Sequence, residues 1–216
     1  MLNLILLGPP GAGKGTQAKK LFADFKIPQI STGDILREAA RNGTEMGRQA
    51  KALMDQGKLV PDEVVIGIVK ERLKQEDAKN GFILDGFPRT VAQAEALEKA
   101  LASNGKKLDR VLAIDVAEEK VVERISGRRS CPKCGAVFHV VSLPAKREGF
   151  CDNDNTGLIQ REDDREEKVI ERMHQYRNNT APLIAFYEKK GLLSTINGSG
   201  SSEGVYLDIK KALGKA

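Results

Sequence analysis

The chain has 216 residues, of which 40% are hydrophobic and 30% are charged, and its formal net charge is +5 at pH 7. This length suits a core with a small inserted domain, and the lack of any run of 18 apolar residues excludes a membrane-spanning helix. Lys and Arg are interspersed with Asp and Glu, so the basic excess indicates a small polyanionic ligand as readily as nucleic acid. Residues 1–7 are apolar without a basic flank, which predicts a buried strand instead of a secretory signal, and we expect a cytoplasmic protein.

The first predicted elements are a strand at Leu4–Leu7, a loop at Gly8–Thr16 (GPPGAGKGT) and a helix that ends near Phe25. The spacing G-x-x-x-x-G-K between a strand and a helix predicts a phosphate-binding loop. Glycines let the backbone wrap around phosphates, and the N–H groups and the helix dipole favour anions, with Lys14 reaching the outer phosphates. Gly15 stands where Ser or Thr usually follows the lysine. We therefore expect Mg²⁺ to be held largely through phosphates and water.

Short apolar runs recur along the chain, each separated from the next by amphipathic segments rich in Ala, Lys and Glu. They are Phe82–Leu84, Val111–Val116 and Leu192–Ile196. Strands that alternate with helices predict an α/β fold, with a parallel sheet covered by helices on both faces. Two intervals break the alternation: residues 31–60 predict a pair of short helices, and residues 127–164 predict a small β-rich insertion.

A long helix is predicted from about Asp164 to Glu188, kinked at Pro182, and a last helix after the Gly- and Ser-rich residues 197–202. Asp163 and Asp164 lie where the insertion meets this helix. They predict either a hinge or, for Asp164, a helix N-cap.

The three cysteines lie close together in the insertion, and in a reducing cytosol they stay as thiols, so their clustering indicates a metal. Two C-x-x-[C/D] arms predict a tetrahedral Zn²⁺ site in which Gly135 allows the tight turn after the first arm. The four preferred ligands are Cys131, Cys134, Cys151 and Asp154. His139 is the rival fourth ligand and Asp152 a third candidate, while three reduced cysteines without a metal are the alternative.

Several motifs follow one another in an order typical of one family. They are GPPGAGKGT, STGDILR at Ser31–Arg37, DGFPRT at Asp85–Thr90, GRR at Gly127–Arg129, and REDD at Arg161–Asp164 with a later Arg172. Together they resemble adenylate kinase, and the insertion resembles the zinc-bearing lid of the long, bacterial-type enzymes. The resemblance implies a P-loop three-layer fold with a core (residues 1–30, 61–126 and 165–216), a helical monophosphate-binding lobe (31–60) and a lid with the metal site (127–164).

The resemblance also implies reversible phosphoryl transfer from Mg·ATP to AMP, giving two ADP, by a monomer with a structural Zn²⁺ in its lid. The residues implied for ATP are Gly11, Ala12, Gly13, Lys14, Gly15, Thr16, Arg124, Arg128, Val137, Phe138 and Gly200. Those implied for AMP are Thr32, Arg37, Lys58, Leu59, Val60, Gly86, Phe87, Pro88, Arg89, Gln93, Arg161 and Arg172, with Gln93 reading the adenine. Those implied for catalysis are Lys14, Arg37, Arg89, Arg128, Arg161, Arg172 and Asp85, with Asp85 orienting water on Mg²⁺.

This chemistry needs no general base, because the acceptor phosphate is already anionic at pH 7. Positioning and positive charge supply the catalysis, which suits a chain with many arginines and two histidines. A kinase for another monophosphate such as UMP, or for a non-nucleotide acceptor, is the rival within the enzymes. A zinc-ribbon protein that binds nucleic acid is disfavoured by 5% aromatic residues and no tryptophan. A regulatory ATP-binding module is disfavoured by the complete set of arginines.

Overall fold

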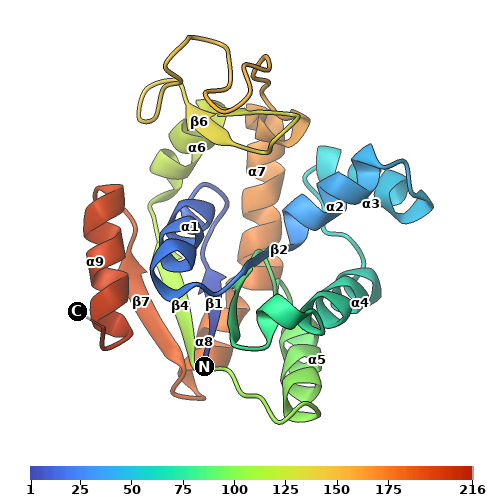
Figure 1. The fold of residues 1–216 in the computed structure, drawn as a ribbon, viewed down its shortest axis with the longest axis vertical. Helices are drawn as coiled ribbons and strands as arrows, with labels where there is room; N and C mark the ends of the chain where they lie inside the picture. Colours follow the sequence, from blue (N-terminus) through green and yellow to red (C-terminus); the bar gives the residue numbers. More distant parts are fainter. Residues whose placement is uncertain (216) are drawn as a thin grey trace.

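A computed structural model describes residues 1–215, which form a five-stranded parallel sheet flanked by helices (Figure 1). The strand order is β2-β3-β1-β4-β7. The strands are β1 (Leu2–Leu7), β2 (Gln29–Ser31), β3 (Gly81–Asp85), β4 (Arg110–Asp115) and β7 (Leu193–Asn197). The buried centres of β1, β3 and β4 are nearly continuous apolar runs, as expected for parallel strands covered on both faces.

Nine α-helices lie within the described residues 1–215: α1 (Lys14–Phe25), α2 (Thr32–Arg41), α3 (Glu45–Asp55), α4 (Asp62–Leu73), α5 (Val91–Ala102), α6 (Glu118–Ser126), α7 (Glu166–Gln175), α8 (Pro182–Glu188) and α9 (Ser202–Ala212). Short helical turns add η1 (Glu76–Ala78), η2 (Glu162–Asp164) and the π-helical η3 (Tyr176–Thr180). Within residues 1–215, none of these helices combines the length and the apolar character that a membrane crossing requires.

Alternate residues of β1 face opposite layers of helices, because successive side chains of a strand point to opposite faces. Leu4 and Leu6 join the buried cluster formed with α1, α6, α7 and α9. Ile5 and Leu7 join the cluster formed with α4, α5 and α8. The predicted three-layer α/β fold is therefore confirmed, and it brings the loops that follow the strands to one edge of the sheet.

The strand β2 is absent from the predicted elements. It has three residues, and only Ile30 is a buried apolar side chain, so it shows neither alternation nor an apolar run. Its pairing with β3 is tertiary in origin. β2 leads directly into α2, which with α3 projects from this side of the sheet (Figure 1).

The long helix predicted from about Asp164 to Glu188 is present as α7, η3 and α8, and it ends at Glu188 as predicted. α7 begins at Glu166, and Asp164 does not cap it, because its side chain points to two arginines instead. The irregularity lies in η3 before Pro182, where the N–H of Ala181 donates to the carbonyl of Tyr176 five residues back. Pro182 then starts α8 at a position where its missing N–H costs no helical hydrogen bond.

The insertion contains a small antiparallel sheet of β5 (Arg128–Ser130) and β6 (Val137–His139) and otherwise consists mainly of turns. It lies above α6 and α7 at the top of the molecule (Figure 1). Its own buried apolar cluster contains only Cys131, Phe138 and Cys151. A core this small needs a further cross-link for stability.

Candidate active site

The loop between β1 and α1 curls around the side chain of its own lysine. Lys14 Nζ donates to the carbonyl oxygens of Gly8 and Pro9, at 2.8 Å each. Gly8 has φ +140°, and a Cβ there would lie 2.4 Å from the carbonyl oxygen of Ile114, so only glycine fits. Burial lowers the pKa of Lys14 to about 8, and three nearby arginines add to this effect. An anion at this helix start would stabilise the ammonium form.

Asp85 ends β3 beside this loop. Its carboxylate accepts a hydrogen bond from Gln29 Nε2 at 2.9 Å, and burial raises its pKa. A Cβ at Gly15 would lie 3.5 Å from Asp85 Oδ2, so the carboxylate faces the start of α1. Asp85 is thus placed where it can hold a cation or a cation-bound water next to the loop. Gln29, which orients it, was missed because it lies in the short strand β2.

Arg89 is held at three atoms while the end of its side chain stays free. Its Nε donates to the carbonyl oxygen of Gly86 at 2.9 Å, which also accepts from Thr32 Oγ1 at 3.0 Å. Its backbone N–H donates to Gln93 Oε1, and its carbonyl accepts from Thr180 Oγ1 at 2.9 Å. Neither terminal nitrogen of Arg89 has a hydrogen-bond partner within residues 1–215. This fork can bind a phosphate through two parallel bonds.

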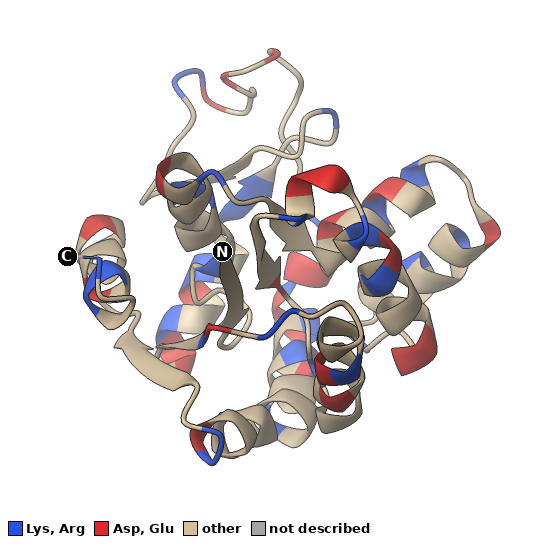
Figure 2. Cartoon of the chain, turned by 60° about the horizontal axis from the view of Figure 1, so that its bottom comes forward, with Lys and Arg blue, Asp and Glu red and all other residues tan. Residues whose placement is uncertain are grey.

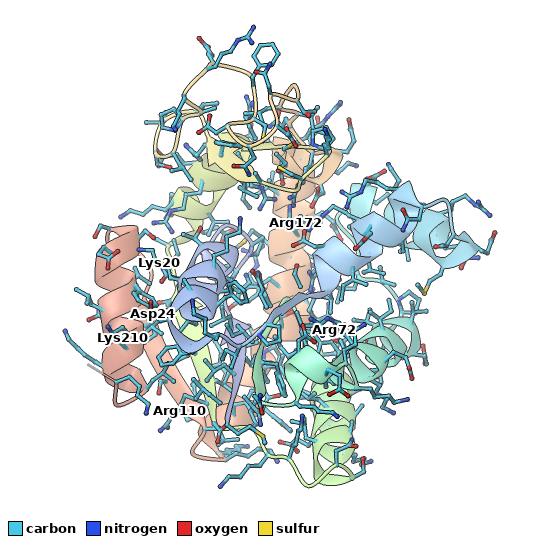
Figure 3. The ribbon with its side chains drawn as sticks, viewed as in Figure 1. Lys20, Asp24, Arg72, Arg110, Arg172 and Lys210 are labelled. Atoms are coloured by element: carbon cyan, nitrogen blue, oxygen red, sulfur yellow. The ribbon has the colours of Figure 1, made fainter. Side chains whose placement is uncertain are left out.

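A buried aspartate, Asp164, and a partly buried one, Asp163, hold the arginines of β5 and α7. Arg128 Nε donates to Asp164 Oδ2 at 2.8 Å, and a second bond joins its Nη2 to Oδ1. Arg172 Nη1 contacts Asp163 at 2.9 Å and Asp164 at 3.1 Å, and Figure 3 labels this arginine on α7. Burial would lower the pKa of Arg128, but its bonds to Asp164 raise it. Asp164, which is fully buried, thereby ties the insertion to α7.

Two further arginines belong to the same positive region. Arg37 pairs with Asp34 at 2.5 Å on α2. Arg161 makes no ion pair or side-chain hydrogen bond within residues 1–215, and its pKa is lowered to about 10, first by burial and then by Arg37. The arginines predicted for catalysis therefore lie near one another, and several carry positive charge that protein carboxylates leave unbalanced.

The remaining residues predicted to contact the nucleotides differ in their exposure to solvent. Arg124 Nη2 donates to the carbonyl of Gly198 at 3.0 Å, which sets it against the loop that carries Gly200. Val137 is exposed, whereas Phe138 is turned into the small core of the insertion. Near α3, Lys58 is exposed and Val60 is buried in the main core. Figure 2 shows both signs of charge on the surrounding helices, without a single-signed face in that view.

The four predicted metal ligands come together. The ligand atoms of Cys131, Cys134, Cys151 and Asp154 all lie within 4.8 Å of one another. The Cys134 and Cys151 sulfurs are 3.5 Å apart, and each Asp154 oxygen is 3.5 Å from Cys131 Sγ. Tetrahedral Zn²⁺ with bonds of about 2.3 Å to sulfur would separate its ligands by roughly 3.8 Å, so the set fits zinc. Gly135 turns the first arm with φ +73°, as predicted.

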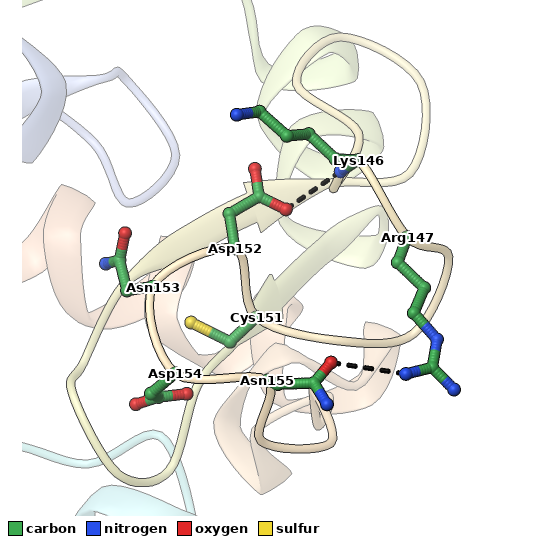
Figure 4. Close-up of a pocket in the computed structure, with 7 residues that line it drawn as sticks. All are labelled: Lys146, Arg147, Cys151, Asp152, Asn153, Asp154 and Asn155. Atoms are coloured by element: carbon green, nitrogen blue, oxygen red, sulfur yellow. Dashed lines mark hydrogen bonds between the residues drawn. The ribbon is translucent and has the colours of Figure 1, made fainter.

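The two rival ligands point elsewhere. His139 Nδ1 accepts from the N–H groups of Val141 and Ser142, both at 3.1 Å. Asp152 Oδ1 accepts from the N–H of Lys146 at 2.8 Å, as Figure 4 shows beside Cys151 and Asp154. Asp154 is thus the fourth member of the cluster.

Comparisons with known proteins agree with this geometry. A family model described as adenylate kinase matches residues 6–192. An adenylate kinase of Archaeoglobus fulgidus is 57% identical over 214 residues, covering 99% of both chains. One of Caldicellulosiruptor saccharolyticus is 59% identical over 213 residues, again with 99% of both chains covered, and one of an Anaeromyxobacter species is 56% identical over 210 residues, or 97% of this chain and 98% of the relative. The chain belongs to the adenylate kinase family and is a nucleoside monophosphate kinase.

Proposed function

We propose that this adenylate kinase transfers the terminal phosphoryl group of Mg·ATP to AMP with the residues described above. The observation that carries the assignment is the group of partly buried cations around Lys14. Arg89, Arg128 and Arg172 all lie close enough to Lys14 to lower its pKa. Such a group suits two phosphorylated substrates that must approach in line. Its positive charges offset the repulsion between the phosphates and stabilise the negative charge of the transition state.

On the donor side, the N–H groups of Gly11 to Thr16 would cradle ATP, and Lys14 would leave the loop carbonyls for the outer phosphates. Arg128 is already oriented by Asp164. Bound Mg²⁺ would neutralise charge on the phosphates, and the carboxylate of Asp85, which faces the start of α1, would hold its water. Arg124, Val137, Phe138 and Gly200 would surround the adenosine part.

On the acceptor side, the free fork of Arg89 would bind the AMP phosphate while Gly86 and Thr180 hold the rest of the residue. Arg37 and Arg161 would approach from α2 and from the end of the insertion. Gln93 would read the adenine, and Lys58 to Val60 would line the base pocket. We expect residues 31–60 and 127–164 to act as mobile lobes whose closure excludes water, which otherwise competes as acceptor.

The cluster of three cysteines and Asp154 would hold a structural Zn²⁺. All four positions are filled by protein, so the metal would take no part in the chemistry. It would supply the cross-link that the small core of the insertion needs.

The experiment that tests the proposal follows diphosphate formation from Mg·ATP with AMP, UMP, CMP and GMP. We expect AMP to be used far better than the others. Arg89→Ala should lower kcat/KM for AMP on the order of 100-fold or more, because the acceptor loses its bidentate partner. Arg110→Ala is the matched control, since Arg110 lies at the opposite end of the sheet and should leave the rate unchanged (Figure 3). An unaltered rate in Arg89→Ala would exclude the role given to it.

A further inference from the structure

The amide of Gln93 lies in a closed set of hydrogen bonds at the start of α5. Its Nε2 donates to Asp62 Oδ1 at 2.7 Å, and its Oε1 accepts from the backbone N–H of Arg89 at 2.7 Å. Asp62 Oδ2 accepts from Thr90 Oγ1 at 2.7 Å, and Thr90 Oγ1 in turn accepts from the backbone N–H of Gln93 at 3.1 Å. The set joins the first residue of α4 to the first turn of α5.

These partners determine which end of the amide is nitrogen and which is oxygen. A carboxylate only accepts hydrogen bonds, and a backbone N–H only donates them. A flipped amide would set Oε1 against the Asp62 carboxylate and Nε2 against the N–H of Arg89. Both contacts are repulsive, and Gln93 is only 1% exposed, so water cannot relieve them.

The fixed orientation has a consequence for base recognition. The amide uses one of its two N–H groups and one of its two oxygen lone pairs within the set. The remaining pair can accept from a 6-amino group and donate to an unprotonated N1, which are the groups that adenine presents. Hypoxanthine and guanine present a 6-oxo group and an N1–H, so they need the flipped amide.

We propose that Asp62 is a specificity-determining positioning residue, which locks the Gln93 amide and thereby favours 6-amino over 6-oxo purine monophosphates. The proposal rests on the proposed function, in which Gln93 reads the acceptor base. Asp62 itself does not touch the base. Asp62 accepts a hydrogen bond from the NH₂ end of the Gln93 amide, and the backbone N–H of Arg89 donates one to its oxygen. Arg89, which is proposed to bind the AMP phosphate, therefore also helps to orient the Gln93 amide.

The test compares AMP with IMP, which differ only at C6 and N1 of the base. The measured quantity is the ratio of kcat/KM for AMP to kcat/KM for IMP, at saturating Mg·ATP. Both values come from the same preparation, so partial loss of folded protein cancels in the ratio. The variants are Asp62→Ala, which removes both carboxylate oxygens, Gln93→Leu, and the control Glu63→Gln on the exposed side of the same helical turn.

We expect Asp62→Ala to lower the ratio about 10-fold or more, which is the size of one hydrogen bond to a charged group. Gln93→Leu should nearly abolish the preference, and Glu63→Gln should keep it, with KM for ATP unchanged in all three. A ratio unchanged in Asp62→Ala but lost in Gln93→Leu would overturn the lock and leave the proposed reading of the base intact. A ratio unchanged in both variants would overturn the reading itself, and the lock with it.

Discussion

Removing the carboxylate of Asp164 should destabilise the protein more than removing any exposed acid. Asp164 is fully buried and contacts two arginines, Arg128 from the insertion and Arg172 from α7. In Asp164→Ala both guanidinium groups keep their charge in a poorly hydrated place. Loss of one partner from a buried ion pair typically costs about 3–5 kcal/mol.

We expect the loss of stability in Asp164→Ala to lie at the lower end of that range. The side chains of Arg128 and Arg172 are 20% and 21% exposed, so water can partly replace the lost partner. Arg172 also keeps its contact to Asp163. We therefore expect a loss of about 3 kcal/mol in the free energy of unfolding. For a chain of this length this corresponds to a fall of roughly 6–12 °C in the melting midpoint.

Urea unfolding followed by circular dichroism measures the loss, with Asp163→Ala as the matched control. Asp163 is 13% exposed and contacts only Arg172 among the arginines, so its removal should cost roughly 1 kcal/mol. If Asp164→Ala is no more destabilising than Asp163→Ala, the shared carboxylate does not hold the insertion to α7 and the reasoning fails.

Burial lowers the pKa of Lys14 to about 8, and bound phosphate favours the ammonium form of its side chain. We therefore expect kcat/KM for ATP to fall as the pH rises through 8. A pH profile of kcat/KM that stays flat to about pH 9.5 would contradict this. Freshly purified protein should contain about one zinc per chain by elemental analysis, and a chelator should lower its melting midpoint. Metal-free protein of equal stability would disprove that structural role. Gly127→Ala places a Cβ 2.4 Å from His139 Nε2 and should cost roughly 1–3 kcal/mol in thermal unfolding. The control Gly67→Ala, which has no neighbour within 4 Å, should be neutral or stabilising.

The parts of the site that depend on local spacing could be predicted from the sequence. The loop from Gly8 to Lys14 follows a strand and opens a helix, and the order of its residues sets its backbone path. The two metal-binding arms are likewise local, since each carries its ligands three residues apart. Only the contact between the two arms, where the sulfurs of Cys134 and Cys151 meet, depends on the tertiary structure. Local chemistry of this kind needs no knowledge of the rest of the fold.

The parts that depend on distant partners could not be predicted. Asp164 has the sequence context of a helix N-cap, and its burial is explained by the two arginines that it contacts, Arg172 and, 36 residues earlier, Arg128. The strand β2 is too short for a periodic pattern, so Gln29 had no assigned place. A signal was present at Thr90 and Gln93, which have the spacing of a capping box. In the structure Gln93 Oε1 bonds the N–H of Arg89, one residue before the cap, which no spacing rule would indicate.

The charge distribution also indicates that this site favours polyanionic ligands. Burial is the main cause of the lowered pKa values of Arg89 and Arg161, to about 10 each, and neighbouring arginines are the second. The positive charges of the site arginines repel one another across a poorly hydrated space. The negative charges of Asp163 and Asp164 are paired with Arg128 and Arg172, and not with Arg89 or Arg161. A polyphosphate removes this repulsion and gains several charge-assisted hydrogen bonds at once. A neutral ligand gains neither, so we expect that the free energy for closing the insertion and the α2–α3 pair over the site would come from the phosphates of the two nucleotides.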